Sequence, residues 1–219
     1  RYRNIRTLIE ELQEICLRIV GWIMHLAPFG LAALLLQLVA TQQGGLLLSL
    51  GHFIAVVTGT TLFHGLIVLP LILWLITRVS PLRFFKSTRE ALITAFVTSS
   101  SAATLPISLR CAEQHLHVRK DIANFVVPLG ATVNMDGTAL YEAAAALFVA
   151  RLAGIELDIA SQCVIFFVAM LGAIGAPGIP SVGMLSMVLV LESVGLPTEA
   201  IAILLPIDRI LDTVRTAVN

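Results

Sequence analysis

The sequence predicts an all-α integral membrane protein: a polytopic helical bundle that contains discontinuous helices and two re-entrant helical hairpins. Of its 219 residues, 58% are hydrophobic and 13% are charged, whereas soluble domains carry about 25% charged residues. Asp, Glu, Lys and Arg are absent between Arg18 and Arg78, and again between Asp158 and Glu192. Because a membrane helix needs only about 20 apolar residues, each of these stretches is long enough for more than one crossing.

The pattern divides the chain into two parts. Residues 1–45 form an amphipathic lead-in and a first, scaffold-type membrane helix, which a short turn at residues 42–45 ends. Residues 46–219 form the second part, which begins with a membrane helix over residues 46–77. The chain opens with Arg1 rather than methionine and stops inside a helical pattern, so we expect it to be part of a longer protein.

A first re-entrant hairpin is predicted over residues 82–117. The stretch Leu92–Leu109 is uncharged but carries Thr98-Ser99-Ser100-Ser101 at its centre. Both of its flanks are basic, which places both on the cytoplasmic side, and a single crossing cannot begin and end on one side. We therefore expect the serine-rich tip to stop within the membrane, where non-helical backbone must be buried or line a cavity. The basic flanking residues are Arg78, Arg83, Lys86 and Arg89 before the stretch and Arg110, Arg119 and Lys120 after it.

Glycine and proline predict a second hairpin over residues 156–195. Residues 175–183 read Gly-Ala-Pro-Gly-Ile-Pro-Ser-Val-Gly, and helices end at such a density of these two residues. The alternative is two ordinary crossings joined by a buried turn. Two interrupted apolar segments in one chain are typical of a transporter whose binding site lies near the middle of the membrane.

Between the hairpins we expect a broken helix over residues 118–151. Its break is Asn134-Met135-Asp136-Gly137-Thr138, inside an otherwise apolar segment. A carboxylate in a bilayer is costly and usually has a function, and a glycine beside it frees backbone carbonyls. With the amide and hydroxyl groups, these are the hard oxygen ligands that suit a desolvated cation. The alternative is an irregular buried turn capped by Asn134 and Asp136.

The last predicted helix, residues 197–219, carries four polar residues at intervals of four, three and four: Asp208, Asp212, Arg215 and Asn219. At about 100° per residue they fall within an arc of about 60° on one face. An arginine fork binds a carboxylate, Asp212 can accept an ammonium group, and Asn219 offers a donor and an acceptor. The set suits a zwitterion with an additional acidic side chain. The alternative is an internal salt bridge between Asp212 and Arg215, which leaves Asp208 and Asn219 unexplained.

Counting charges predicts coupling to cations. Four acids are expected in the membrane, and Arg215 is the only base expected to face them, which leaves an excess of three negative charges. An anionic substrate adds to that excess, so it should bind only together with cations or protons. Glu142 is the candidate proton carrier because burial favours a neutral carboxyl group; alternatively, it stays protonated throughout. The four acids are Asp136, Glu142, Asp208 and Asp212.

Several residues and function classes are set aside. Arg209 lies off the polar face and is expected to pair with a neighbouring carboxylate or reach the membrane surface. His52 and His64 are expected to be isolated histidines of the core. No nucleic-acid partner, organic cofactor or enzymatic activity is expected, since no basic run has interleaved aromatic residues and no histidine forms a recognisable motif with the serines. An ion channel is the alternative from another class, although channels favour symmetric rings of like groups.

Taken in order, the serine-rich hairpin, Asn-Met-Asp-Gly-Thr, the glycine/proline hairpin and Asp-x-x-x-Asp-x-x-Arg-Thr resemble the glutamate transporter family of dicarboxylate/amino acid:cation symporters. The resemblance covers nearly the whole chain. It implies a partial glutamate-transporter-like fold in a multi-pass protein of the cell membrane. Residues 46–219 would be a transport domain that moves like an elevator within a homotrimer.

The resemblance also implies an activity: a secondary active symporter that couples sodium entry, with a proton as a further candidate ion, to uptake of glutamate or aspartate. A C4-dicarboxylate or a neutral amino acid is the alternative substrate. Asp212 argues against the first, which has no ammonium group, and Arg215 argues against the second, which would leave the guanidinium unpaired.

The site residues carried over by the resemblance come from every predicted segment. Those for the substrate are Ser100, Ser101, Thr138, Ile179, Gly183, Asp212, Arg215, Thr216 and Asn219. Thr138 and Arg215 would hold the side-chain carboxylate, Asp212 the amino group, and Asn219 the main-chain carboxylate. Three sodium sites are implied. Gly130, Asn134 and Asn219 resemble one site of the family, and Thr132 with backbone carbonyls near Ala173, Ile174 and Ala176 resembles a second. Asn134 and Asp136 resemble part of a third. Glu142 matches the proton-carrying acid.

This chain departs from the family pattern in three respects. The family places a second arginine near the substrate, at positions that are Ser99 and Thr213 here, so this arginine is missing. The second hairpin reads Ala176-Pro177 where several relatives have Thr-Ala, which would stiffen it. The family's first four membrane helices are absent, so this chain is not expected to transport alone.

Overall fold

The computed structural model describes residues 44–219 continuously and, before them, scattered residues between 7 and 40. The chain divides into two compact units, residues 1–43 and residues 44–219. Most of the predicted lead-in and first membrane helix, residues 1–45, therefore lies outside the described residues. Within the first unit, Arg18 forms an exposed ion pair with Glu14 at 2.8 Å, one helical turn away.

Helices make up the second unit, and residues 44–219 contain no strand. This confirms the predicted all-α class for that range. In chain order the elements are α2 (Gly44–Phe63), the π-helical turn η1 (His64–Val68), α3 (Leu69–Thr77), α4 (Pro81–Thr98), α5 (Ser101–Arg110), the π-helical turn η2 (Cys111–His115), α6 (Lys120–Val133), α7 (Asp136–Leu152), α8 (Ile159–Ile174), α9 (Gly183–Ser193), the 3-10 turn η3 (Thr198–Ala200) and α10 (Ile201–Val218).

One helical stretch among the described residues, Gly45–Thr77, is long and apolar enough to cross a membrane. Its 33 residues extend over about 50 Å at about 1.5 Å per residue, more than the roughly 30 Å of a hydrocarbon core. The helix already begins at Gly44, so the turn predicted at residues 42–45 is wrong for its last two positions. By contrast, α8 and α9 are apolar but have only 16 and 11 residues, too few to cross alone.

Local sequence explains the helix breaks. α4 ends at Thr98 because Ser99 takes the left-handed conformation, with φ of 50°. Ser100 then starts α5 as its N-cap, since its side chain accepts a hydrogen bond from the Ala103 N–H. Further along, Asn134 and Met135 are non-helical and separate α6 from α7. Both breaks coincide with the polar motifs of the sequence.

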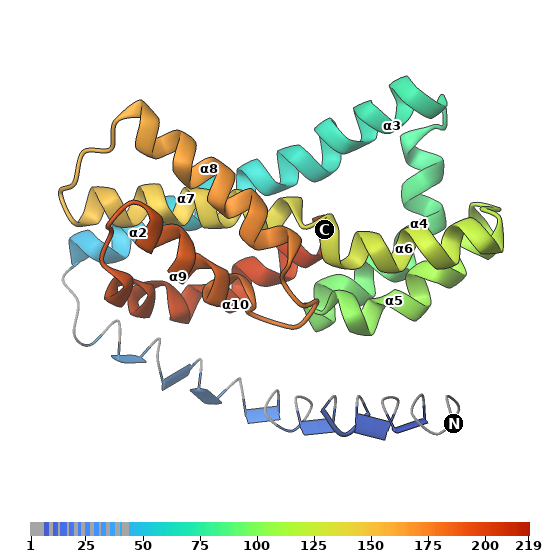
Figure 1. Ribbon diagram of the computed structural model, residues 1–219, viewed down its shortest axis with the longest axis horizontal. Coiled ribbons are helices and arrows are strands. Elements are labelled where there is room, and N and C mark those ends of the chain that lie inside the picture. The colour runs from blue at the N-terminus through green and yellow to red at the C-terminus, as the bar shows by residue number, and fades with distance from the viewer. Residues whose placement is uncertain are drawn as a thin grey trace. The chain divides into compact units, whose positions relative to one another are not determined.

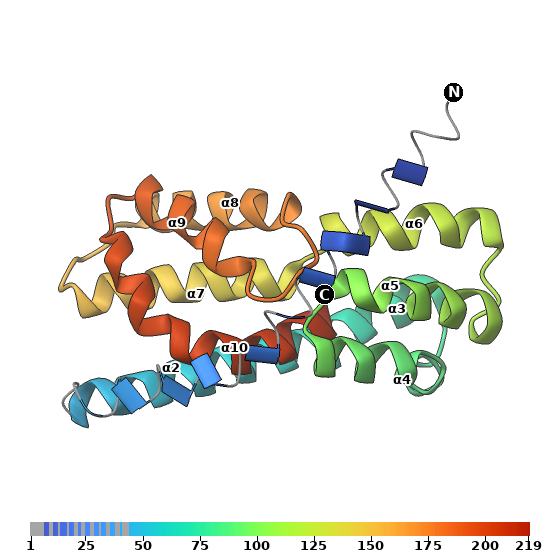
Figure 2. The same ribbon diagram turned by 90° about the horizontal axis from the view of Figure 1, so that it is seen from below.

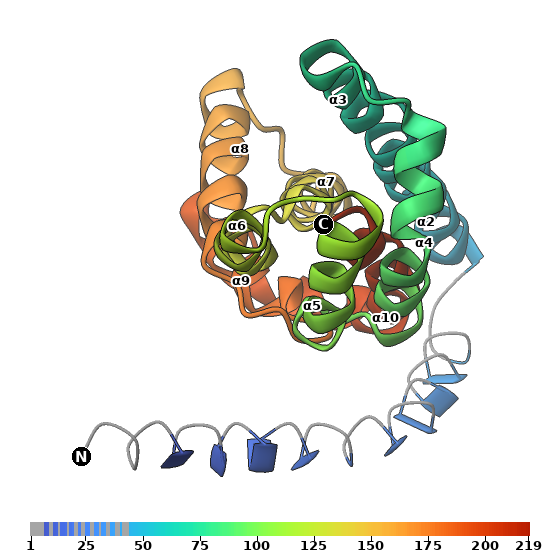
Figure 3. The ribbon, with the colours of Figure 1, turned by 90° about the vertical axis from the view of Figure 1, so that its right-hand side faces the viewer.

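The last helix, α10, lies at the centre of the second unit. It packs against α2, α4, α7 and α9, while α4 pairs with α5 and α8 pairs with α9 as two helical hairpins. Figure 1 shows the α8–α9 pair and the α4–α5 pair at opposite ends of this unit, with α10 reaching between them. Viewed from the end, α7 lies between α8 and α2 (Figure 3).

Small residues allow the central helices to approach closely, and large apolar residues cover the outside. Ala145, Ala146 and Ala150 on α7 are buried, as is usual where helices pack tightly within a membrane. Outward-facing residues include Ile76, 78% exposed, and Phe125, 69% exposed. A continuous apolar exterior of this kind indicates a surface that faces lipid or another protein.

Asp158 caps the start of α8, and this cap should make stability depend on acid. Its Oδ1 accepts a hydrogen bond from the Ser161 N–H at 2.8 Å. Hydrogen bonds from the side chain and backbone of Ser161 hold the pKa of this exposed carboxyl group below its usual range. The folded state therefore binds fewer protons than the unfolded state, and the stabilisation present above about pH 4 is lost as the pH falls through the lowered folded-state pKa.

We predict that Asp158→Asn, which keeps a capping oxygen but does not titrate, makes the protein less sensitive to acid. The measurement is the thermal unfolding midpoint of the purified full-length protein between about pH 5 and pH 2, the range over which such a cap is lost. If the midpoints of variant and wild type fall in parallel, the cap does not titrate as described.

Candidate functional site

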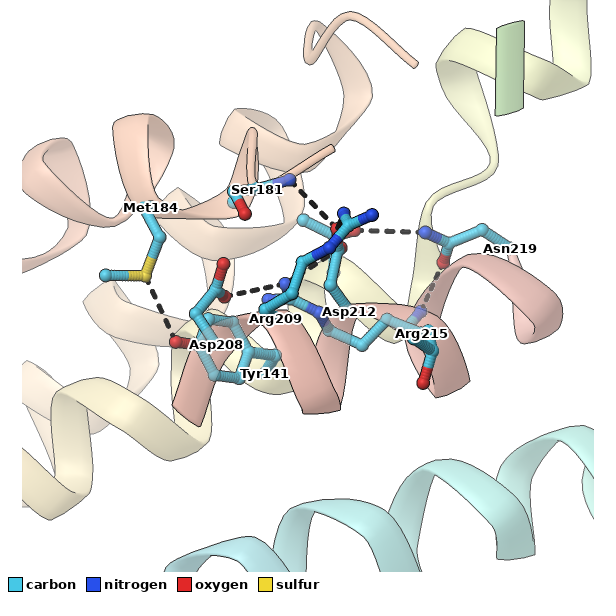
Figure 4. A network of polar contacts seen from close by, with 12 residues as sticks. Tyr141, Ser181, Met184, Asp208, Arg209, Asp212, Arg215 and Asn219 are labelled. Carbon is cyan, nitrogen blue, oxygen red and sulfur yellow. Dashed lines mark hydrogen bonds and ion pairs between the residues drawn. The ribbon is translucent and has the colours of Figure 1, made fainter. Parts of the chain in front are cut away.

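The site is organised around Arg215, which is 1% exposed. Its Nη2 donates to Asp208 Oδ1 at 2.7 Å and to Asp212 Oδ1 at 2.9 Å, and its guanidinium lies 3.9 Å from the centre of the Tyr141 ring. Figure 4 shows these side chains between α10 and the helices above it. The internal salt bridge considered as an alternative is thus present, and it explains Asp208 as well, because Asp208 shares the arginine.

The arginine is only partly satisfied by these contacts. Its Nε and Nη1 are buried without a hydrogen-bond partner among the described residues, and so is Asp208 Oδ2. Since buried polar groups are nearly always paired in native proteins, unpaired donors on a cation indicate a place for an anionic acceptor. Gly183 lies directly beside them: a Cβ there would sit 3.0 Å from Nη1 and 3.3 Å from Thr138 Cγ2.

Asp212 connects the second hairpin to α10. Its Oδ2 accepts a hydrogen bond from the Ser181 N–H at 2.9 Å, and Ser181 takes a left-handed conformation with φ of 59°. The same oxygen lies 3.6 Å from Arg209 Nη1. Asp212 therefore has donors at both oxygens, although a carboxylate oxygen accepts more than one hydrogen bond and Oδ1 has only Arg215 as a donor among the described residues.

The tips of the two hairpins are hydrogen-bonded to each other. The Gly178 carbonyl accepts from Ser100 Oγ at 2.9 Å and from the Ala102 N–H at 3.0 Å. A Cβ on Gly178 would come within 3.0 Å of Ala102 N and Ser101 Cβ, so glycine permits this close approach. Figure 2 shows the loop after α8 next to the start of α5. Ser100 and Ser101 therefore lie beside Gly178, the residue that precedes Ile179.

Asn219 ties the broken helix to α10. Its Oδ1 accepts from the Gly137 N–H at 2.8 Å and its Nδ2 donates to Thr138 Oγ1 at 3.0 Å. The first N–H groups of a helix have no partner within the helix, so Asn219 satisfies one at the start of α7. This accounts for the polar residue that the salt-bridge alternative had left unexplained.

Three helix beginnings are therefore gathered near the C-terminal half of α10. The starts of α5, α7 and α9 are held through Gly178, Asn219 and Asp212 respectively. Helix N-termini carry partial positive charge and free N–H groups, and they favour anions. The sequence pointed to Ile179 and Gly183 in the second hairpin, but it did not show which backbone N–H groups are held at these helix starts.

The residues expected to bind sodium are brought together only in part. Gly130, Asn134 and Asn219 line one cavity of about 620 Å³, which Thr216 also lines and which is otherwise largely apolar. Thr132, however, is exposed, and its hydroxyl donates to the Leu129 carbonyl of its own helix at 3.0 Å. Among the hydrogen bonds of the described residues, none joins Thr132 to the end of α8, where Ala173 and Ala176 are buried and Ile174 is 39% exposed.

Two histidine predictions were wrong. His64 is not isolated, because its Nε2 lies 3.0 Å from Asp136 Oδ2, and His52 is exposed rather than part of the core. His64 belongs to the π-helical turn η1, which widens the helix at that point. Asp136 is thus in contact with a helical segment that the sequence did not connect to it.

Glu142 is fully buried on α7 and accepts a hydrogen bond through Oε1 from Ser186 Oγ on α9. Its Oε2 is buried without a partner among the described residues. The carboxyl group therefore lies between α7 and the second hairpin, away from water.

The charge count from the sequence needs correction. Arg215 is not the only base facing the acids, because Arg209 reaches Asp212. The excess of negative charge falls from three to two, and it resides on Asp136 and Glu142 if both are ionised. The expectation that Arg209 pairs with a neighbouring carboxylate is confirmed.

Some residues of the site could not be assigned a role from the sequence. Gly178 and Ser181 lay within the glycine/proline break, but only the fold shows which backbone groups bond. Tyr141 is fully buried, and its hydroxyl lies 3.2 Å from Met184 Sδ. At the positions where the second arginine is missing, Ser99 is buried and Thr213 donates to the Ile210 carbonyl of its own helix.

Comparison with known proteins gives the family. Residues 1–219 match the model of the Sodium:dicarboxylate symporter family. The chain belongs to this family. Membership confirms the resemblance stated from the motifs and, with the apolar helix Gly45–Thr77, places the chain in the cell membrane.

Three relatives illustrate the similarity. Excitatory amino acid transporter 2 of Mus musculus is 44% identical over 217 residues, covering 95% of this chain and 37% of the relative. Excitatory amino acid transporter 3 of Mus musculus is 43% identical, covering 95% and 40%. The putative sodium-dependent excitatory amino acid transporter glt-4 of Caenorhabditis elegans is 38% identical, covering 99% and 44%. The chain thus spans less than half the length of these relatives.

We predict that Gly183→Ala destabilises the protein, because the added methyl would press on Arg215 Nη1 at 3.0 Å and the buried arginine cannot move aside. Overpacking of this kind costs about 1–3 kcal/mol, which should lower the thermal unfolding midpoint of the full-length protein. The matched control is Gly175→Ala in the same hairpin, where a Cβ meets nothing within 4 Å and φ is −102°. Equal midpoints for the two variants would show that Arg215 is not tightly enclosed.

Proposed function

We propose that this chain is the transport-domain portion of a carrier that couples sodium entry to uptake of an acidic amino acid such as glutamate or aspartate. The observation that carries the proposal is Arg215: a buried cation that binds two carboxylates yet retains two unpaired donors. A substrate with its own carboxylate supplies the missing acceptor.

The substrate roles follow from the groups around Arg215. The side-chain carboxylate binds Arg215 Nε and Nη1 near Thr138, and the ammonium group binds Asp212. The main-chain carboxylate lies near Asn219 and the N–H groups at the start of α5, with Ser100 and Ser101. Ile179 and Gly183 cover it from the second hairpin, and Thr216 supports the site from α10. The three helix starts favour this anion electrostatically.

Sodium is bound where helices end rather than begin. α6 ends at Val133 and α8 ends at Ile174, and helix C-termini present free carbonyls with partial negative charge. Gly130, Asn134 and Asn219 form one site on a shared cavity. Thr132 with Ala173, Ile174 and Ala176 forms a second, which requires movement of Thr132. Asn134 and Asp136 contribute to a third.

The arrangement in the membrane is part of the proposal. α8 and α9 are each too short to span the bilayer alone, which supports a re-entrant hairpin, and the α4–α5 hairpin meets it tip to tip. The full protein is then polytopic, with residues 46–219 as a domain that moves within a homotrimer. The apolar exterior of the described unit fits contact with lipid and with the remainder of the protein.

A C4-dicarboxylate is a second candidate substrate, which one observation favours. Asp212 already has donors on both oxygens, from Arg215 and Ser181. It therefore has hydrogen-bond partners without a substrate ammonium group, and a dicarboxylate would not leave it unpaired.

We predict that the full-length protein in proteoliposomes takes up labelled aspartate when an inward sodium gradient is imposed and not when choline replaces sodium. Arg215→Cys should abolish uptake of aspartate, since removing the guanidinium leaves the substrate carboxylate unpaired in a buried site. Arg119→Cys, which alters an exposed arginine paired with Asp121 at 3.3 Å, is the control and should transport normally. Sodium-independent uptake would refute the coupling, and preferential uptake of succinate would favour the dicarboxylate.

We further predict that Glu142→Gln removes the pH dependence of this uptake. If Glu142 carries a proton with the substrate, uptake by wild type declines as the external pH rises above neutrality, because fewer carriers are protonated. Glutamine keeps an acceptor for Ser186 but cannot exchange a proton. Identical pH profiles for variant and wild type would assign the carboxyl group a permanently protonated, structural role.

A further inference from the structure

Arg209 is the second arginine beside Asp212. It precedes Asp212 by three residues on α10 and points off the polar face, yet its Nη1 lies 3.6 Å from Asp212 Oδ2. Its Nη2 lies 3.5 Å from the Thr98 carbonyl at the end of α4. Residues three apart are neighbours on a helix surface, so Arg209 lies between Asp212 of its own helix and the end of α4. Figure 4 shows its guanidinium close to Asp212.

Two guanidinium groups consequently flank one carboxylate. Arg215 binds Oδ1 of Asp212, and Arg209 lies beside Oδ2. The side chain of Arg209 is 24% exposed, but its Nη1 is buried without a hydrogen-bond partner among the described residues. Buried cationic N–H groups seldom lack an acceptor. Together with Nε and Nη1 of Arg215, this is a set of unpaired donors around Asp212 that an oxygen-rich anion would satisfy.

The charges of the cluster formed by Asp208, Arg209, Asp212 and Arg215 also favour binding of an anion. Asp208 and Asp212 carry two negative charges, and Arg215 alone would balance one of them. Arg209 balances the other, so the four groups together are neutral. Without Arg209 the cluster would be negative, and it would then favour a neutral zwitterion over an amino acid of net negative charge, since like charges repel strongly in a site shielded from water.

We propose that Arg209 is a specificity-determining residue: its guanidinium balances the charge of Asp212 and donates Nη1 to a carboxylate of the bound substrate, so that the site selects anionic amino acids over neutral ones of the same size. The inference rests on the proposed function of this site. Its contact with Thr98 holds the guanidinium at the first hairpin, where the same substrate would be enclosed.

The test compares aspartate with asparagine, which have nearly the same shape and differ in charge. Their affinities are measured on purified full-length protein in saturating sodium, for wild type, Arg209→Gln and Arg209→Lys. Arg209→Gln should lower the preference for aspartate over asparagine by about tenfold or more, because discrimination between isosteres is large when a buried polar group loses its partner. Arg209→Lys keeps the charge and should retain most of the preference.

A merely structural role would lower both affinities by the same factor, so an unchanged ratio in Arg209→Gln overturns the proposal. Arg209→Met, which fills similar volume without charge, serves in the same way if Arg209→Gln does not fold. Arg110→Gln is the control: it removes an arginine at the far end of α5, paired with Glu90 at 2.7 Å, and should leave the ratio unchanged. Wild-type protein that binds neither amino acid would instead overturn the proposed function itself.

Discussion

The buried ion pairs of Arg215 determine how the second unit is assembled. An arginine that is 1% exposed cannot remain charged inside a membrane protein without matched partners. Asp208 and Asp212 supply them from the same helix, and Arg209 of that helix balances the second negative charge. Neighbouring segments add further contacts to these charges. The ring of Tyr141 lies against the Arg215 guanidinium, and the Ser181 N–H, in the loop before α9, donates to Asp212.

Broken helices extend this arrangement to the backbone. An unbroken helix pairs its interior N–H and C=O groups internally. Each break leaves backbone C=O groups without a partner where one helix ends, and N–H groups where the next begins. In this chain the released N–H groups meet acceptors on α10 and at Gly178, and the released carbonyls lie at the ends of α6 and α8. Oppositely charged ligands can thereby be separated within one small volume, without a large number of ionised side chains in the bilayer.

The sequence predicted the ends of the helices better than it predicted the side-chain contacts between them. Residues such as Ser99, Asn134 and Gly175 mark helix ends because their local conformational preferences are strong, and the helical period placed Asp208, Asp212 and Arg215 together. Arg209 was expected to pair with a neighbouring carboxylate and does so, whereas His64 was misjudged for a different reason. The angle of a residue on a helix gives the direction of its Cβ, but a long or flexible side chain can reach a partner elsewhere, and only the packing of helices distant in sequence shows which partner is available. Thr132 shows another limit of a motif, because its hydroxyl donates to the Leu129 carbonyl of its own helix and the sequence pattern does not show such a local bond.

The backbone carbonyl of Gly178 links the tips of the two hairpins. It accepts hydrogen bonds from both Ser100 and Ala102, so one acceptor on the second hairpin holds two donors of the first. If the second hairpin withdraws, both donors must be hydrated at once. Separation of the two tips would therefore expose the start of α5 to water in the same step, so the solvation of one tip is coupled to the position of the other.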